Sequence, residues 1–482
     1  MRIRPKLRFA CATAACSLVL GLGAAVPVRA QSLIEALSTT YNSNPDLLAQ
    51  RALLRQTDET LAQAVANWRP RVSLSVEYNK LQYNSLPAVR PATYYALNGR
   101  TTLLSVTQPL FRGGKTVADT KAAQANIQSQ RALLQDTEQT VLLQAANTYA
   151  DLLRDVGIVD VRKNNVRVLV QQLDATRERF RVGELTITDV SQAEARLEQA
   201  KADLVQAEAV VRVDQAAFQR VTGAKPGTLG ELPLIGALPA SEDESVALAM
   251  DYGPRALSAQ HRITAASYGV NSAISALLPQ VNLVGFVQYQ QDLQAPNDQY
   301  YQYGVRVQAT VPIYQNGSEW SAIRQAKEVV GQRRNELDSA RRLAAQTVIS
   351  AWRNLDSARS RVTSFTAQVK ANDVALNGVR QEALVGSRTT LDVLNAEQEL
   401  LNSQVNLISA RRDVQVNYYG VLAGIGRLTA RTLGLPVEYY DEEKYYNEVG
   451  SRWIGDWGAG SSGGTSPGSS NSGSTKAGAT NR

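Results

Sequence analysis

The residues that could carry covalent chemistry are few in this 482-residue chain, and they form no recognisable catalytic set. Both cysteines, Cys11 and Cys16, lie in the first 30 residues, and the single histidine, His261, has no partner in the sequence for metal binding or general-base work. Lys115 follows two glycines as in a phosphate-binding loop, but the first glycine of that motif would fall on Pro109. We therefore predict that the chain is not an enzyme and uses no cofactor or metal.

The polar residues with the most informative spacing lie in two matching turns, because the chain carries two copies of one pattern. The segment Gly183–Glu194 aligns with Gly386–Glu397 at an offset of 203 residues, which places Asp189 on Asp392. Prolines further upstream match at an offset of 209, so the first copy carries an insertion of six residues between positions 70 and 109. A duplicated architecture follows.

Both ends of the chain predict segments outside the folded protein. Residues 1–30 have the pattern of a cleaved signal peptide, with basic residues before an apolar run and a small-x-small site before Gln31. Removing them lowers the formal net charge from +7 to +2, so a nucleic-acid partner is not predicted. Residues 458–482 are almost entirely Gly, Ser, Thr, Asn and Ala, and we expect a disordered tail there.

Two stretches predict helices far longer than a globular core uses. From Lys115 to about Arg181, and again from Ser318 to about Val385, the chain is dense in good helix formers, so each stretch predicts a helix of about 65 residues. A shorter helix follows each, with an apolar seam that repeats every seven residues, as in a coiled coil. The seam residues are Val190, Leu197, Leu204, Val211 and Phe218 in the first copy, and Val393, Leu400, Leu407, Val414 and Val421 in the second. The seam alone would also fit a soluble helical bundle.

Segments of alternating apolar and polar residues ahead of each long helix argue against a soluble bundle. Residues 71–79 and 301–313 alternate clearly, and 97–107 and 281–290 are assigned as their partners. Each pair predicts a hairpin about ten residues tall, the height that a tilted strand needs to cross a bilayer. Aromatic residues near the strand ends predict the membrane interfaces: Trp68, Tyr78, Tyr83, Tyr289, Tyr301 and Tyr303.

Four strands cannot close a barrel, and open edges in hydrocarbon would leave backbone N–H and C=O groups unpaired. Neighbouring copies must therefore share one sheet. Two copies would give eight strands with a filled interior, and three would give twelve, wide enough for an aqueous lumen. The predicted fold class is a mixed α and β membrane protein with duplicated halves, each a β-hairpin followed by long coiled-coil helices.

This pattern divides the chain into ten predicted segments. They are the signal peptide (1–30), first-half N-terminal helices (31–69), first hairpin (70–110), coiled-coil helices of the first repeat (111–225), inter-repeat linker (226–253), second-half helix (254–278), second hairpin (279–314), coiled-coil helices of the second repeat (315–430), an equatorial segment (431–457) and the tail (458–482). The equatorial segment, rich in tyrosine, is expected to pack around the middle of the helices.

Together these features resemble a known family. The run Asn-Pro-Asp-Leu at 44–47, the run Gln-Pro-Leu-Phe-Arg-Gly-Gly at 108–114 and the paired turns look like those of TolC-type outer-membrane efflux and type I secretion channels, over about residues 31–430. The resemblance implies a homotrimer, with a twelve-stranded barrel in the outer-membrane lipid of a Gram-negative bacterium and an α-barrel in the periplasm. It also implies a periplasmic adaptor (membrane fusion protein) and an inner-membrane ABC or proton-driven transporter as partners.

The resemblance further implies an entrance at the periplasmic tips of the coiled coils, closed by aspartate rings and an arginine link. The matching positions are Thr188 and Asp189 in the first turn, and Arg388, Asp392 and Asn395 in the second. Ala383 replaces a tyrosine of the link. Asn395 replaces a second aspartate of the family, which leaves one carboxylate ring, from Asp392, so weaker cation binding is expected than with two rings. The alternative is that Asp189 and Asp392 are ordinary helix N-caps.

The predicted function is a passive export duct for proteins, small molecules or both, driven by the partner transporter. A periplasmic structural coiled coil without channel activity is the main alternative, and it would need no detergent and give no heat-modifiable β signal. A surface-displayed autotransporter would need a full barrel in one chain, which has too few strands.

Overall fold

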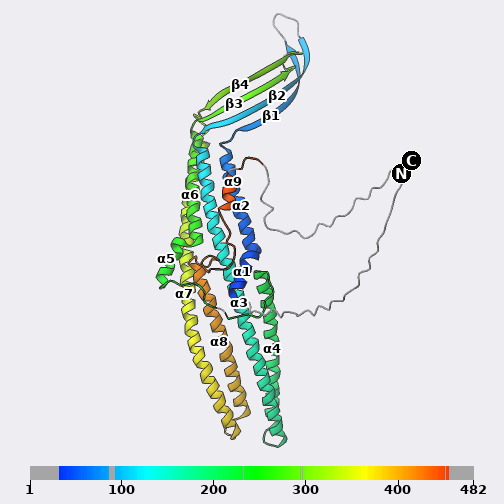
Figure 1. Ribbon diagram of the computed structural model, residues 1–482, viewed down its shortest axis with the longest axis vertical. Helices are drawn as coiled ribbons and strands as arrows, with labels where there is room; N and C mark the ends of the chain where they lie inside the picture. Colours follow the sequence, from blue (N-terminus) through cyan, green and yellow to red (C-terminus); the bar gives the residue numbers. More distant parts are fainter. Residues whose placement is uncertain are drawn as a thin grey trace, which may run out of the picture.

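The computed structural model describes residues 32–85, 93–231, 233–293, 295, 297–450 and 452–454, without the side chains of 83–85 and 93–95. The predicted signal peptide and the predicted tail lie outside these residues. Figure 1 shows one elongated molecule, with a β-sheet at one end and two pairs of helices reaching the other. The mixed α and β fold is confirmed.

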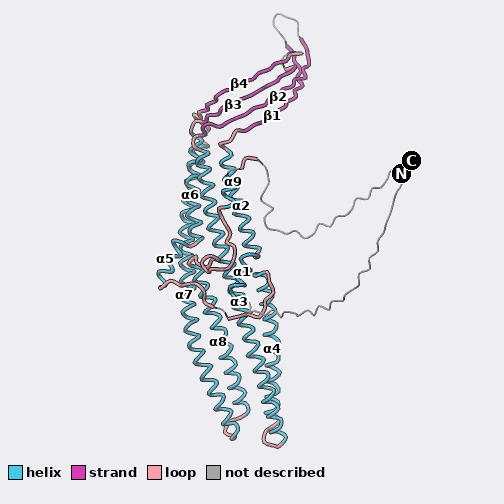
Figure 2. The backbone as a smooth tube through the Cα atoms, in the orientation of Figure 1, coloured by secondary structure: helices cyan, strands magenta, loops and turns pink. Residues whose placement is uncertain are grey.

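The sheet contains the strands β1 (Arg71–Ser85), β2 (Thr93–Arg112), β3 (Gln280–Gln291) and β4 (Gln299–Thr310). They are antiparallel in the order β1-β2-β3-β4, so the two hairpins join through β2 and β3. Within the described chain, β1 and β4 each pair on one side only. The strands occupy one end of the molecule, and helices make up the remainder apart from the connecting loops (Figure 2).

The strands are longer than the predicted height of about ten residues, at 12 to 20 residues. The alternation fades after Asn79, but pairing continues to Ser85, which faces Thr93. Ladder hydrogen bonds hold this stretch extended although its side chains carry no periodic signal. At the other end β4 stops at Thr310, short of the predicted 313, because Pro312 has no N–H to donate.

The helices predicted to be long are each continuous. The helices α3 (Lys115–Arg181) and α7 (Ser318–Leu384) have 67 residues each, or about 100 Å at 1.5 Å per residue. The other helices are α1 (Leu33–Ser43), α2 (Pro45–Ala66), α4 (Ile187–Thr222), α5 (Glu242–Tyr252), α6 (Pro254–Ile274), α8 (Thr390–Gly424) and α9 (Lys444–Gly450), with a 3-10 turn at Ser275–Leu277. No helix in the described part of the chain is long and apolar enough to cross a membrane.

Both copies enter the long helix through two residues in the left-handed region. Gly114 and Gly317 both have φ near +79°, and the preceding residues, Gly113 and Asn316, have φ of +61° and +57°. A Cβ on Gly113 would lie 2.6 Å from the Ser275 carbonyl oxygen. The first copy therefore needs glycine at a position where the second accepts asparagine.

The main hydrophobic cluster lies midway along the molecule, where α1, α2, α3, α4 and α8 meet. Its largest buried side chains include Tyr149, Tyr419 and Phe218. The hydroxyl of Tyr149 donates to the Gly230 carbonyl at 2.8 Å, and that of Tyr419 donates to the Pro233 carbonyl at 2.6 Å. These buried donors hold the inter-repeat linker against the core.

Residues 431–457 were predicted to pack around the middle of the helices. The described part of this segment begins there but then follows α2 toward the sheet. The Tyr440 N–H donates to the Tyr41 hydroxyl near the middle (3.0 Å), and the Tyr445 hydroxyl donates to Glu59 of α2 (2.6 Å). Further along the segment, Trp453 stacks against Arg69, which lies just before β1. The Arg69 guanidinium is 4.7 Å from the centre of the Trp453 ring. Tyrosine hydroxyls and arginine stacking fix the path, and neither leaves a periodic signal in the sequence.

Candidate functional site

The candidate entrance consists of two helical tips at the end of the molecule farthest from the sheet (Figure 1). A short turn with Gly183 at φ +82° joins α3 to α4, and the matching turn with Gly386 at φ +78° joins α7 to α8. Nothing lies within 4 Å of a Cβ placed on either glycine, so the backbone conformation, not a close contact, favours glycine at both.

Each tip starts its second helix with a capping box. The Asp189 N–H donates to the Thr186 hydroxyl at 3.3 Å, and the Asp189 carboxylate accepts from the Thr186 N–H at 3.0 Å. Thr389 and Asp392 repeat both bonds at 3.2 and 3.0 Å. The N-caps are therefore the threonines and not the aspartates, which lie three residues later. Each threonine has the extended backbone of an N-cap, and the aspartate bonds back to it.

The hydrogen bonds of the capping boxes keep both carboxylates charged. Bonds from the Thr186 side chain and backbone lower the pKa of Asp189, and bonds from the Thr389 backbone and side chain lower the pKa of Asp392. Thr188 lies between Thr186 and Asp189 in the chain, and it is exposed in the first turn of α4. Both aspartates therefore stay ionised at neutral pH.

Arg388 forms its ion pair inside its own turn. Its Nε lies 2.9 Å from Glu382 at the end of α7, and both side chains are about half exposed. The first tip also has an ion pair, at 3.0 Å, but with the charges reversed: Arg179 lies at the end of α3 and Glu184 in the turn. Within the described residues of one chain, no hydrogen bond or ion pair joins Thr188 or Asp189 to the second tip. The predicted entrance residues thus form two separate groups in one chain.

Asn395 has a partner that the sequence pattern did not reveal. Arg196 of α4 donates from Nη2 to the Asn395 Oδ1 at 3.2 Å, which links the first coiled coil to the second. The residue that matches Arg196 in the second copy is Glu399. This break in the repeat was the only signal for the link in the sequence.

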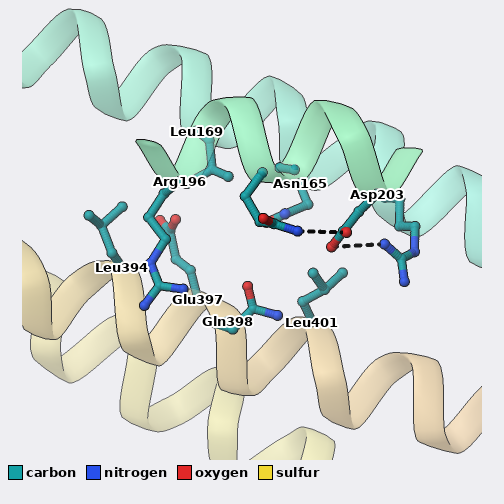
Figure 3. A pocket seen from close by; sticks show the side chains of 11 residues that line it. Asn165, Leu169, Arg196, Asp203, Leu394, Glu397, Gln398 and Leu401 are labelled. Carbon is teal, nitrogen blue, oxygen red and sulfur yellow. Dashed lines mark hydrogen bonds and ion pairs between the residues drawn. The ribbon is translucent and has the colours of Figure 1, made fainter. Parts of the chain in front are cut away.

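A buried acid lies two residues beyond Asn395 on α8. Glu397 accepts a hydrogen bond from Arg380 of α7 at 2.9 Å, and its side chain is 5% exposed. Arg177 and Glu194 form the matching pair in the first copy at 2.6 Å, but there Glu194 is 46% exposed. Figure 3 shows Glu397 beside Arg196 in a small cavity between the coiled coils. Because the repeat predicts equal environments for the two glutamates, sequence reasoning missed this burial.

The outer strands expose the candidate membrane surface. Tyr78 of β1 is 59% exposed, and Tyr303 of β4 is 82% exposed. Tyr289 and Tyr301 face one another across β3 and β4, with ring centres 4.7 Å apart. The apolar residues exposed beside these tyrosines are Val72, Leu74 and Val76 on β1, and Val305 and Val307 on β4. The chain by itself leaves these side chains uncovered.

The other aromatic predictions have different outcomes. Trp68 is 46% exposed between α2 and β1, and its carbonyl accepts a hydrogen bond from Gln108 at 2.8 Å. The side chain of Tyr83 lies outside the described part of the chain. His261 is partly buried on α6, and burial lowers its pKa. The ammonium of Lys115 bonds to Ser272 at 2.8 Å, so it is engaged within the fold.

Comparison with known proteins identifies the family. The family model described as outer membrane efflux protein matches residues 36–224 and 252–427, which is most of the chain. The chain belongs to the outer membrane efflux protein family. It is therefore an outer-membrane protein of the TolC type, related to channels and not to enzymes.

Named relatives of this efflux family member include efflux and secretion proteins. It is 36% identical over 427 residues to the outer membrane efflux protein BepC of Brucella suis biovar 1 (strain 1330), covering 88% of this chain and 92% of BepC. It is 26% identical over 431 residues to the outer membrane protein TolC of Escherichia coli (strain K12), covering 84% of each. The alkaline protease secretion protein AprF of Pseudomonas aeruginosa is 26% identical over 325 residues, 64% of this chain and 66% of AprF.

Solved structures of outer-membrane channels share the fold. The outer membrane protein VceC of Vibrio cholerae matches with a TM-score of 0.70 at 19% identity, over 82% of this chain and 96% of VceC. The CmeC outer membrane channel of Campylobacter jejuni matches with a TM-score of 0.73 at 16% identity, over 87% and 89%. The arrangement of strands and long helices in this efflux family member is thus that of known channels.

Proposed function

We propose that three copies of this chain form one export duct, which crosses the outer membrane and extends through the periplasm. The observation that carries the proposal is the sheet with two open edges. Its outer strands expose Val72, Leu74 and Val305 at 64 to 74%, and β1 and β4 each have a free side within the described chain. Backbone groups at such edges must be paired inside a bilayer, and the β4 of one copy can pair with the β1 of the next.

An assembly of three copies would pair the open edges of the sheets and enclose a lumen. Twelve strands enclose an aqueous interior, whereas eight would be filled by their own side chains. The aromatic residues Trp68, Tyr78, Tyr83, Tyr289, Tyr301 and Tyr303 would then lie at the membrane interfaces. The helices of about 100 Å supply the reach into the periplasm. In this proposal the chain has the ten segments predicted from the sequence.

The entrance of the duct would lie at the tips. One ring of carboxylates, from Asp392, would face the axis, and Thr188, Asp189, Arg388 and Asn395 would lie beside it, with Arg388 as part of the lock. The lowered pKa of Asp392 is consistent with this assignment, because the ring stays charged at neutral pH. Asn395 supplies no second ring, so cation binding at the entrance should be weaker than with two rings.

The duct has no chemistry of its own to drive export, so energy would come from an inner-membrane ABC or proton-driven transporter coupled through a periplasmic adaptor. BepC is named an efflux protein and AprF a protease secretion protein. Small-molecule efflux and protein secretion are therefore both candidate functions for this chain.

Planar-bilayer recording of the detergent-purified protein tests the proposal. A duct gives discrete conductance steps, and a non-channel periplasmic coiled coil gives none and stays soluble without detergent. Crosslinking in cells from a photoreactive residue placed at Leu185 or Ser387, both at the tips, should capture an adaptor subunit. The same residue placed on the sheet edge at Val305 should capture only a second copy of this chain.

A further inference from the structure

Two matching ion pairs differ in a way that the repeat does not explain. Arg177–Glu194 and Arg380–Glu397 each join a long helix to the shorter helix after it, at 2.6 and 2.9 Å. Glu194 is 46% exposed, as expected for a surface pair. Glu397 is 5% exposed, although it occupies the same position in its own coiled coil.

The first coiled coil covers Glu397. Leu394, one turn earlier on α8, is 2% exposed and belongs to the same apolar cluster as Leu169, Leu197 and Ala200 of α3 and α4. In this position the Oε2 of Glu397 has no hydrogen-bond partner among the described residues. Burial raises the pKa of Glu397 even though the Arg380 guanidinium counteracts it. A charged glutamate therefore disfavours contact between the two coiled coils.

Arg196 has the opposite effect. It extends from α4 to Asn395 on α8 at 3.2 Å, and a guanidinium carries five N–H donors. Arg196 and Glu397 line the same cavity, as Figure 3 shows. That cavity has a volume of about 10 Å³, room for one water at most. Arg196 and Glu397 thus share a cavity, while Arg380 bonds to the Oε1 of Glu397 and no described residue bonds to its Oε2.

We propose that Arg196, Asn395 and Glu397 form a restraint inside each subunit, which sets how firmly the second coiled coil is held against the first. The restraint rests on the proposed channel function, and it includes one of the entrance residues, Asn395. When the second coiled coil moves away, the bond between Arg196 and Asn395 breaks and Glu397 becomes hydrated. Arg196 therefore favours the closed entrance, whereas the charge of Glu397 favours opening.

Arg196 and the charge of Glu397 are expected to have opposite effects on the open probability. Planar-bilayer recording of four purified variants tests this. Arg196→Ala should raise the open probability about fivefold or more. Glu397→Gln keeps the acceptor for Arg380 but removes the buried charge, so its open probability should be equal to or below that of the unmodified protein. Glu194→Gln, the exposed counterpart, should match the unmodified protein. Arg388→Ser reports on the tips separately.

The results separate this inference from the proposed function. If Arg388→Ser opens the channel and Arg196→Ala does not, the restraint is wrong and the channel stands. If Arg196→Ala, Glu397→Gln and Glu194→Gln all raise the open probability together, general loosening explains the data and the restraint is again overturned. If neither the unmodified protein nor Arg388→Ser conducts, the proposed function itself fails.

A crosslink provides a second measurement that does not depend on loss of the arginine. Both native cysteines lie in the predicted signal peptide, so Arg196→Cys with Asn395→Cys supplies the only thiols of the mature chain. In the Arg388→Ser background, a short cleavable thiol crosslinker between them should lower the conductance, and cleavage should restore it. Bridged subunits that conduct as well as unbridged ones would overturn the restraint. The pair Arg177→Cys and Glu194→Cys, bridged within the first coiled coil, is the matched control and should leave the conductance unchanged.

Discussion

The two coiled coils of this chain share one backbone design but not one environment. α3 and α7 each have 67 residues, yet α3 has 21 buried residues and α7 has seven. The reason is position, because α3 packs against α1, α2, α4, α6 and α8, whereas α7 packs against α5, α6 and α8. Large apolar side chains such as Trp320 and Val374 of α7 remain more than half exposed. In the proposed assembly, α7 would gain its missing contacts from another copy.

Duplication therefore fixes local structure, while neighbours decide what each side chain does. The capping boxes are the same in both copies, since they depend only on residues within one turn. Residues with distant contacts diverge: Glu194 is exposed and Glu397 buried, and Asp214 of α4 matches Asn417 of α8. Substitutions at several of these positions should therefore have different effects in the two copies.

The largest difference is expected between the two tip arginines. Arg388→Ser should raise the conductance of the purified channel several-fold in planar bilayers, because it removes the proposed lock in every subunit at once. Arg179→Ser breaks the ion pair of the first tip, in which Arg179 occupies the position of Glu382, and should leave the conductance unchanged. Equal effects of the two substitutions would reject the lock at Arg388.

The turns that lead into the long helices should differ in stability. Gly113→Asn should lower the free energy of unfolding by about 2–3 kcal/mol, because its Cβ would clash with the Ser275 carbonyl. Asn316→Gly, at the matching position, should change it by less than about 1 kcal/mol. Thermal unfolding in detergent, followed by helical circular dichroism, measures both. Similar losses in the two variants would contradict the proposed close approach.

The matched pair Asp214 and Asn417 predicts a pH effect. Burial, and then a hydrogen bond with the Asp155 carboxyl, raise the pKa of Asp214 well above its ordinary 3.8. Between the ordinary and the raised value the folded chain holds a proton that the unfolded chain has lost, so the free energy of unfolding falls as pH rises.

Asp214→Asn copies the residue of the second repeat and removes this penalty. The variant should be more stable than the unmodified protein by about 1–3 kcal/mol near pH 8 and equal to it near pH 4. Thermal unfolding at the two pH values measures the difference. A gain of the same size at both pH values would contradict the titration of Asp214.

The smallest effects are expected at the capping boxes. Thr186→Ala and Thr389→Ala should each lower the free energy of unfolding by about 1 kcal/mol, since each removes one cap acceptor from its helix. Hydrogen exchange of the first turn of α4 and α8 would measure them. Because the bond lengths agree within 0.1 Å, unequal losses would show that one tip has additional contacts.

The sequence predicted what depends on neighbouring residues along the chain. The run without proline from Lys115 gave the extent of α3, and the 203-residue offset predicted α7 from it. The strand end at Ser85 was not predictable, because ladder bonds to Thr93 hold it and its side chains lack alternation. The burial of Glu397 and the bond between Arg196 and Asn395 were also not predictable, since both depend on how α8 packs against α4.

Single-particle imaging of the detergent-extracted protein would show whether the four-stranded sheet is one third of a shared barrel. We expect three copies around one axis, with β4 of each copy paired to β1 of the next and a single lumen continuing into the helical tube. A monomeric particle, or an assembly in which the edges of β1 and β4 stay apart and no common lumen exists, would contradict it.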